Sequence, residues 1–272
     1  MKPVEERIRA ALSAGEEELR LLITDPHPEV ISNAVLNRSL SEDMAVYIAK
    51  RKTATAETLT FLAGDVRFKD SYKLRAAICR NPRTPQRVTL SLLKFMRIFD
   101  LSDIANDQRI NIVIRQKIEY IISERLPSMP SGVMTALARK TNPSMLLRLV
   151  EHGDEKVVSA CLDSPMLTET HVCRAVNGPA AGSVLVRLVC EHAKWSLRYS
   201  VRYALIRNFH TPTMFAAEYI SGMKTSDLQD LYSDTKTPLS SKPFIYRELL
   251  NRGEGTEPGP DEVHELDEDG HL

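Results

Sequence analysis

The sequence has few of the residues that sheets need. Aromatic residues make up 6% of the 272 positions, glycine occurs 11 times, and Leu, Ala, Arg and Glu dominate the middle of the chain. This composition favours helices over strands. Because 43% of the residues are hydrophobic, the chain can bury a continuous core. We therefore expect an all-α protein.

Secretory and membrane-spanning segments are also missing from the sequence. The first residues, MKPVEERIRAALSAGEEELR, are charged throughout and lack the apolar centre and cleavage site of a secretory signal. No run of about 18 uncharged apolar residues occurs that could span a bilayer. These absences predict a cytoplasmic chain without a membrane partner, whose four cysteines stay reduced.

Charge is balanced in number but not in position. The chain has 36 basic and 36 acidic residues, yet residues 253–272 contain eight Asp or Glu and no Lys or Arg, which leaves 36 basic and 28 acidic residues in the rest. The stretch GEGTEPGP and the acidic run after it cannot bury enough apolar surface to fold. We expect 253–272 to be a disordered acidic tail.

The dominant pattern is an internal repeat with an offset of 127 residues. This offset sets YKLRAAICRNPRTPQ (72–86) against YSVRYALIRNFHTPT (199–213), and 12 of the 36 pairs between 72–107 and 199–234 are identical. We call the residue 127 positions later the counterpart of the first. The identical pairs are Tyr72/Tyr199, Arg75/Arg202, Ala77/Ala204, Arg80/Arg207, Asn81/Asn208, Thr84/Thr211, Pro85/Pro212, Met96/Met223, Asp100/Asp227, Leu101/Leu228, Asp103/Asp230 and Asp107/Asp234.

A shorter period lies within each copy. The alanines Ala34, Ala77, Ala160 and Ala204 are separated by 43, 83 and 44 residues, which indicates a step of about 42 residues with three short helices. Amphipathic segments such as AETLTFLAG and SMLLRLVEHG alternate with helix-ending signals. The signal RNPRTP predicts a left-handed Asn81 at a helix end, Thr84 as the next N-cap and Pro85 as the first helical residue.

The period, the three-helix step and the repeated RNPRTP-like signal resemble HEAT and armadillo-like α-solenoids and the bacterial leucine-rich repeat variant, over residues 15–252. The resemblance implies a right-handed α-solenoid of about six HEAT/ARM-like repeats of about 42 residues, in two tandem halves. We place the halves at 1–125 and 126–252. Solenoids of this kind bind proteins, peptides or nucleic acids, and the fold does not choose among them.

Catalytic and metal-binding motifs are missing, and the repeat explains the cysteines and histidines. Cys161, Cys173, Cys190 and Cys79 have Ala34, Val46, Ala63 and Ile206 as counterparts, so they read as small core residues. The counterparts of His171, His192 and His210 are Met44, Asp65 and Arg83. A group of His192, Cys190, His171 and Cys173 is the best metal or nucleophile candidate, and core packing is the better reading. We predict no metal, no cofactor and no catalytic residue.

The strongest candidate site is a cluster of basic residues. Nine Lys or Arg lie between Arg67 and Arg97, against Asp70 alone. One reading is structural: the arginines cap helix carbonyls and pair with Asp100, Asp103, Asp227 and Asp230. The other is that they line a groove for an acidic peptide, a nucleic-acid backbone or the acidic tail. The candidate partner-binding residues are Tyr72, Arg75, Arg80, Arg83, Arg87, Tyr199, Arg202 and Arg207.

Three functions remain open from the sequence. The first is a non-enzymatic scaffold or adaptor that holds a protein or acidic peptide in the solenoid groove. The second is nucleic-acid binding, with a resemblance to the HEAT-like alkylpurine DNA glycosylases. Those enzymes use Trp, Tyr and a carboxylate at the lesion, whereas this chain has one Trp. The third is an enzyme of a type that the sequence does not reveal. We expect the scaffold.

Overall fold

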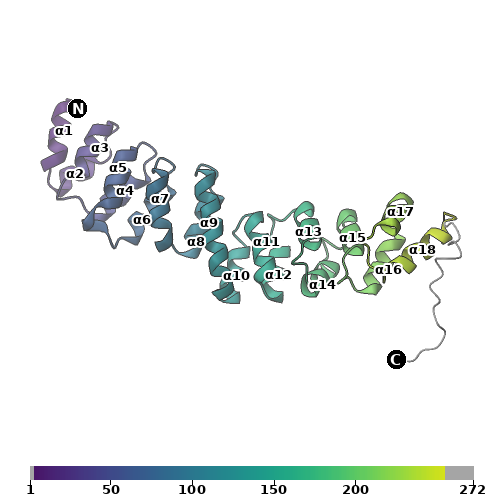
Figure 1. Ribbon diagram of the computed structural model, residues 1–272. Helices are drawn as coiled ribbons and strands as arrows, with labels where there is room; N and C mark the ends of the chain where they lie inside the picture. The colour runs from purple at the N-terminus through teal and green to yellow at the C-terminus, as the bar shows by residue number, and fades with distance from the viewer. Residues whose placement is uncertain (1–2, 255–272) are drawn as a thin grey trace. The chain divides into compact units, whose positions relative to one another are not determined.

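The computed structural model describes residues 3–254, and every regular element in this range is helical (Figure 1). The all-α class predicted from composition is therefore confirmed. The eighteen α-helices are α1 (Val4–Ser13), α2 (Glu16–Leu22), α3 (Pro28–Ala34), α4 (Glu42–Lys50), α5 (Ala56–Gly64), α6 (Tyr72–Arg80), α7 (Gln86–Leu92), α8 (Ile98–Asn106), α9 (Ile112–Arg125), α10 (Ser131–Ala138), α11 (Pro143–His152), α12 (Glu155–Leu162), α13 (Glu169–Val176), α14 (Ser183–Glu191), α15 (Tyr199–Ile206), α16 (Thr213–Ser221), α17 (Thr225–Ser233) and α18 (Lys242–Asn251).

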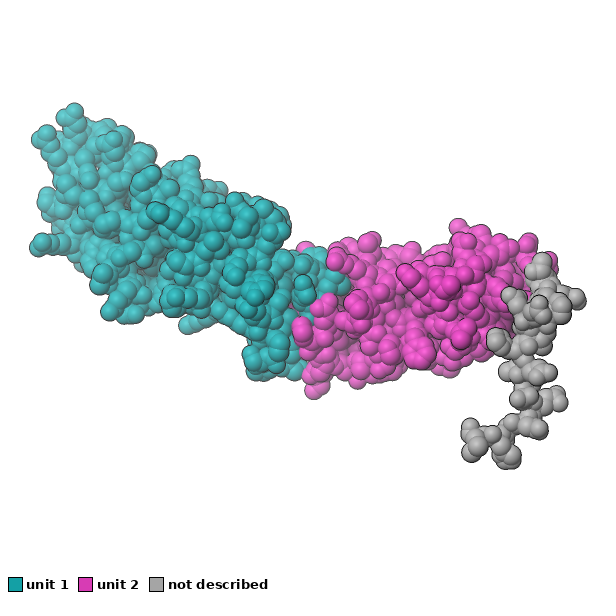
Figure 2. Space-filling model, in the orientation of Figure 1, with its two compact units in different colours: residues 1–148 teal, residues 149–272 magenta. Residues whose placement is uncertain are grey.

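The chain forms two compact units, Met1–Arg148 and Leu149–Leu272 (Figure 2). We call them unit 1 and unit 2. The boundary between them falls inside α11. The halves 1–125 and 126–252, which were placed by the sequence offset, stay a prediction. Of the predicted disordered tail 253–272, residues 255–272 lie outside the described residues.

Side chains at the helix starts explain where many helices begin. The hydroxyl of Ser71 accepts a hydrogen bond from the Leu74 amide at 3.0 Å at the start of α6, and the carboxylate of Asp154 accepts one from the Val157 amide at 3.0 Å at the start of α12. Each bond satisfies an amide that the first helical turn leaves without a partner. The short polar residues between apolar segments therefore set the helix boundaries.

In unit 1, helices pack on others close to them in the chain. Helix α1 packs on α3, α4 on α6, and α8 on α9, while α6 also contacts α5, α7 and α8. Leu19, Ile48 and Leu59 are fully buried in a cluster that joins α1 to α7. Because the helices have 7 to 14 residues, their stability comes from this packing rather than from intrinsic helix propensity.

Unit 2 has the same neighbour-to-neighbour packing. Helix α12 packs on α14, α13 on α15, α15 on α16, and α16 and α17 on α18. Trp195 is 1% exposed, and its indole N–H donates to the Leu162 carbonyl at 2.9 Å. Tyr219 is buried as well and donates to the Cys190 carbonyl at 3.3 Å. Both large side chains therefore close helix ends while filling the core.

The 127-residue offset relates the positions of helices as well as identical residues. Residues 56–64 and 183–191 form α5 and α14, and residues 98–106 and 225–233 form α8 and α17, so both pairs match at both ends. The other seven helices of the first copy each overlap a helix of the second copy under the same shift. The duplicated sequence thus specifies the same order of nine helices twice.

The helix-ending signal works differently from the sequence prediction. Asn81 is extended, with φ −84° and ψ 119°, and no non-glycine residue of the described range has a positive φ. The amide side chain of Asn81 donates to the carbonyls of Ala49 at 2.8 Å and Arg51 at 3.0 Å and accepts from the Arg83 amide at 3.0 Å. These three bonds need an extended Asn81, so the left-handed prediction was wrong.

Thr84 and Pro85 also take other roles than expected. Pro85, not Thr84, is the N-cap of α7, which begins at Gln86. The hydroxyl of Thr84 donates to the Ile78 carbonyl at 2.6 Å, and Thr211 donates to the Leu205 carbonyl at 2.6 Å in the second copy. The threonine therefore closes the preceding helix instead of opening the next one.

We expect Asn81→Ala to lower the free energy of unfolding by about 1–3 kcal/mol, because it leaves the buried Ala49 carbonyl and the Arg83 amide without a partner and removes one of the two hydrogen bonds to the Arg51 carbonyl. Urea denaturation followed by circular dichroism measures the loss. The control is Gln108→Ala at an exposed position, which should change stability by less than about 0.5 kcal/mol. Equal stability of the two variants would contradict the role given to Asn81.

Candidate functional site

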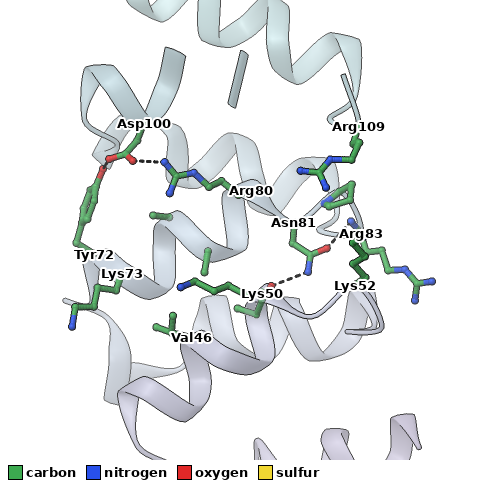
Figure 3. Close-up of a pocket in the computed structure, with 14 residues that line it drawn as sticks. Val46, Lys50, Lys52, Tyr72, Lys73, Arg80, Asn81, Arg83, Asp100 and Arg109 are labelled. Atoms are coloured by element: carbon green, nitrogen blue, oxygen red, sulfur yellow. Dashed lines mark hydrogen bonds and ion pairs between the residues drawn. The ribbon is translucent and has the colours of Figure 1, made fainter. Parts of the chain in front are cut away.

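The main candidate site is an open pocket of about 710 Å³ in unit 1 (Figure 3). It lies where the end of α4, the whole of α6 and the turns after α4, α6 and α8 meet. We call it the unit 1 pocket. Its lining consists of Val46, Ala49, Lys50, Lys52, Tyr72, Lys73, Ala76, Ala77, Arg80, Asn81, Pro82, Arg83, Asp100 and Arg109.

One wall of the pocket is a closed polar network. The hydroxyl of Tyr72 donates to the carboxylate of Asp100 and accepts from the Arg97 amide at 3.1 Å. Arg80 pairs with the same carboxylate at 2.5 Å and with Asp103 at 3.2 Å. Burial and the Asp100 carboxylate raise the pKa of Tyr72. This wall is therefore held together by its own charges and contributes little free charge to the pocket.

Four cations of the lining are of another kind. Lys50, Lys52, Lys73 and Arg83 are exposed, and within residues 3–254 their side chains make no hydrogen bond or ion pair. Figure 3 shows Lys73 toward one end of the pocket and Arg83 toward the other. The unit 1 pocket therefore presents uncompensated positive charge from more than one side.

Helix dipoles account for only some of these positions. Lys50 ends α4, and a cation at a helix C-terminus stabilises the helix. Lys73 lies in the first turn of α6, which contains no acidic residue, and there a cation is disfavoured by a few tenths of a kcal/mol up to about 1 kcal/mol. The helix dipole therefore does not account for the position of Lys73.

Unit 2 contains the equivalent pocket. It has a volume of about 420 Å³ and is lined by the counterparts of seven residues of the same region of unit 1, and by Gly178. Asn208 donates to the Val176 carbonyl at 2.6 Å, as Asn81 does to Ala49. The lining residues are Val176, Asn177, Gly178, Arg207, Asn208, Phe209, His210 and Lys236.

Comparing the two pockets shows which lining residues both copies of the fold share and which occur in unit 1 only. Tyr72, Arg80, Asn81 and Asp100 have identical counterparts. The free cations do not, because Lys50, Lys52, Lys73 and Arg83 have Asn177, Pro179, Ser200 and His210 as counterparts. The same local structure therefore forms without these four cations, which belong to unit 1.

The structure divides the arginines predicted for the site. Arg80 and Arg83 line the unit 1 pocket, whereas Arg75 donates to the Lys69 carbonyl at 3.2 Å and stacks on Phe95 at 5.3 Å. Arg87 is exposed and is not part of the lining. The structural reading, that arginines cap carbonyls and pair with aspartates, therefore holds for Arg75 and Arg80.

The second copy repeats this division with one change. Arg202 donates to the Ser196 carbonyl at 2.5 Å, and the Tyr199 hydroxyl donates to Asp227 and accepts from the Lys224 amide at 2.9 Å. Arg207 lines the unit 2 pocket but pairs with Asp234 at 2.5 Å. The expected partners of Arg207, Asp227 and Asp230, are not the ones it contacts. Asp227, Asp230 and Asp234 all have an aspartate as counterpart in the first copy, so the sequence alone did not show which of them pairs with Arg207.

Sequence reasoning missed the lysines at this site. Lys50 and Lys52 lie outside the basic cluster between Arg67 and Arg97, and only the fold of α4 brings them beside α6. Arg109 also reaches the pocket, although it pairs with Asp107 at 2.7 Å and lowers the pKa of that carboxyl. The change from lysine to Asn177 and Pro179 in the second copy was the signal that could have identified Lys50 and Lys52.

The cysteine and histidine group proposed as a weak metal candidate is occupied by other contacts. His171 Nδ1 lies 2.7 Å from the Thr168 hydroxyl, and His192 Nε2 lies 3.3 Å from Asp163. Burial raises the pKa of the Cys190 thiol to about 11. Between residues 3 and 254, no three His, Cys, Asp or Glu side chains are placed to hold a metal ion.

Compared with known protein families, curated proteins and solved structures, the chain gives no match. The resemblance to HEAT and armadillo-like proteins therefore stays a prediction. Within the described part of the chain, none of the helices has the length and apolar character needed to cross a bilayer.

We expect an alkylating reagent at pH 8 to modify Cys173 first in the folded chain. Burial raises the pKa of all four thiols, but Cys173 is partly exposed, whereas Cys79 and Cys161 are buried with a pKa of about 12 and so stay unreactive thiols. Mass spectrometry of peptides identifies the modified position, and the urea-unfolded chain, in which all four should react, is the control. Rapid labelling of Cys79 in the folded chain would contradict the burial described here.

Proposed function

We propose that the protein is a non-enzymatic α-solenoid scaffold that binds an acidic segment of a partner protein in the unit 1 pocket. The proposal rests on four cations, Lys50, Lys52, Lys73 and Arg83, whose side chains have no partner within the described residues. None of the four has a lysine or arginine as its counterpart in unit 2. Acidic side chains would supply the missing charge.

The spread of these cations favours an extended ligand over a compact anion. Lys73 lies in the first turn of α6 and Arg83 lies three residues beyond its end at Arg80. The seven helical steps from Lys73 to Arg80 alone span about 10 Å. A single phosphate or carboxylate contacts one end only. An extended segment with several acidic residues can contact both, while small side chains such as Val46 and Ala76 offer it an apolar floor.

The aromatic residues argue for a protein rather than a nucleic acid as partner. Single-stranded nucleic acids bind through bases stacked on open aromatic rings. The lone aromatic residue of the lining is Tyr72, whose ring is covered by the Arg97 guanidinium at 4.4 Å from its centre. Trp195 is buried, so it is not available as the open aromatic of an alkylpurine glycosylase site.

The solenoid part of the proposal rests on packing within each unit. The main helix–helix contacts join helices one or two places apart in the chain, which is the contact pattern of stacked repeats. Eighteen helices in residues 3–254 agree with six steps of three helices. We also propose the cytoplasm as the location, because the cysteines of the chain are all free and reducing compartments keep them so.

Small-angle scattering tests the solenoid. We expect a radius of gyration well above the roughly 19 Å of a compact domain of this length. A value near 19 Å in dilute, monodisperse solution would rule out stacked repeats along the whole chain.

Substituting the cations by their counterparts tests the pocket. We expect the triple variant Lys50→Asn, Lys73→Ser and Arg83→His, made in residues 1–254, to bind a fluorescent ten-residue polyglutamate peptide about tenfold more weakly at low salt. Each exposed ion pair contributes roughly 0.2–1 kcal/mol, and three of them sum to about the 1.4 kcal/mol of a tenfold change. Fluorescence anisotropy measures the Kd.

The matched control is Lys156→Glu, which places the residue of its counterpart Glu29 at an exposed position of unit 2. It should leave binding within about twofold. Because each substitution uses a residue that the other copy accepts, we expect all variants to fold, and circular dichroism verifies this. Equal peptide affinity in the triple variant and the control would exclude the unit 1 pocket as the binding site.

A further inference from the structure

A second pocket of unit 1, with a volume of about 520 Å³, lies between α5, α6 and α7. We call it the α5–α7 pocket. Its residues from α6 are Leu74, Arg75 and Ile78, whereas Ala76 and Arg80 of the same helix line the unit 1 pocket. Because an α-helix has about 3.6 residues per turn, the two sets lie on opposite faces of α6. The α5–α7 pocket is therefore a separate site.

At the equivalent positions, unit 2 has two large aromatic side chains. Phe68 and Leu92 line the α5–α7 pocket, and their counterparts are Trp195 and Tyr219. Trp195 and Tyr219 are each 1% exposed, so unit 2 buries aromatic rings where unit 1 has smaller side chains and a cavity. A cavity of about 150 Å³ is enough to hold benzene. The α5–α7 pocket thus has room for an aromatic ring.

The contacts of Tyr219 show which group these positions accept. The Arg202 guanidinium lies 5.0 Å from the centre of the Tyr219 ring, and the Tyr219 hydroxyl donates to the Cys190 carbonyl at 3.3 Å. Arg75 is the counterpart of Arg202. Ala63 is the counterpart of Cys190, and both Arg75 and Ala63 line the α5–α7 pocket. Unit 1 therefore keeps the cation and the helix-end residue that hold a phenol ring in unit 2.

Charge at the pocket favours an acidic residue beside the ring. Nη2 of Arg75 donates to the Lys69 carbonyl at 3.2 Å, while its Nε is buried and, within residues 3–254, has no hydrogen-bond partner. Lys69 lines the pocket, and the ammonium of Lys94 lies 4.8 Å from the centre of the Phe95 ring, against Asp70 as the one acidic lining residue. A carboxylate would accept from the Arg75 Nε and offset this positive charge.

We infer that the α5–α7 pocket binds a tyrosine side chain of a partner protein, together with an acidic residue next to that tyrosine. The ring lies against the Arg75 guanidinium in a cation–π contact. Its hydroxyl donates to the Ala63 carbonyl, as happens at the counterpart carbonyl in unit 2, and the neighbouring carboxylate accepts from the Arg75 Nε. Phenylalanine makes the first of these contacts and not the second, so the pocket prefers tyrosine.

The dipeptide N-acetyl-Glu-Tyr-amide is the probe that tests this site. Its binding to the full chain at low salt is measured by NMR, from the broadening of the tyrosine ring signals. We expect N-acetyl-Glu-Phe-amide to bind at least about threefold more weakly, because it lacks the hydroxyl. We also expect p-cresol, which has the ring and hydroxyl but no carboxylate, to bind more weakly than the tyrosine dipeptide. Tighter binding of p-cresol would indicate a free phenol as ligand and overturn the protein partner.

A double variant, Leu92→Tyr with Phe95→Gly, gives the α5–α7 pocket the residues of unit 2. Because the new ring occupies the space, we expect this chain to bind the tyrosine dipeptide at least about tenfold more weakly. The matched control is Arg87→Met, which places the residue of its counterpart Met214 on α7 outside the lining and should change binding by less than about twofold. Circular dichroism verifies that both fold. Equal binding to the two chains would overturn the inference.

Lysine acylation of the natural chain locates the site even if the double variant does not fold. The tyrosine dipeptide should slow the labelling of Lys69 measurably and leave Lys73, on the unit 1 pocket, unchanged. Unchanged labelling of Lys69 at a saturating dipeptide concentration would contradict binding in the α5–α7 pocket.

The triple variant Lys50→Asn, Lys73→Ser and Arg83→His separates this site from the unit 1 pocket. We expect it to bind the tyrosine dipeptide as the natural chain does. Loss of dipeptide binding in the triple variant, with binding kept in the double variant, would place the dipeptide in the unit 1 pocket and overturn the inference. If the dipeptide binds as expected and polyglutamate does not bind the natural chain, the inference stands and the proposed function is wrong.

Discussion

The structure depends on how short helices close their carbonyl ends. A helix leaves its last four carbonyls without a partner inside the helix. Because the helices here have about nine residues each, the chain contains many such helix ends. Here a polar side chain about 30 residues later in the chain supplies the missing donor. Asn81 bonds to Ala49, Arg125 to Met96 and Arg252 to Met223. Each such bond joins one helix to a helix that follows it in the chain. The same hydrogen bond therefore satisfies a carbonyl at a helix end and holds neighbouring helices together.

The duplication shows which residues serve this closure. Asn81 and Arg125 have Asn208 and Arg252 as counterparts, and the hydrogen bonds recur with them. Charges on the pocket rim follow no such rule, since Lys73 is replaced by Ser200. Two copies of one structure thus act as an internal control: what both need is structural, and what one copy adds to the surface is free to serve a ligand.

Much of the fold could be predicted from the sequence, because the relevant signals are local. Apolar spacing in segments such as AETLTFLAG and helix-ending signals such as RNPRTP indicated short helices, and the offset of 127 residues indicated that they recur. Side-chain partners could not be predicted to the same degree. Arg207 had three recurring aspartates within reach, and Lys50 joined the site only through the packing of α4 on α6. The conformation of Asn81 was also misjudged, because two of its three bonds go to the carbonyls of Ala49 and Arg51, about 30 residues earlier in the chain.

The single tryptophan lies in the core of unit 2, with its indole bonded to Leu162. Indole emission therefore reports the solvent around α12 and α14 and is silent about unit 1. Circular dichroism, in contrast, weighs all eighteen helices. If one part of the chain unfolds before another, the unfolding transitions measured by tryptophan emission and by circular dichroism will differ. Comparing the two transitions therefore shows whether unit 2 unfolds together with the rest of the chain.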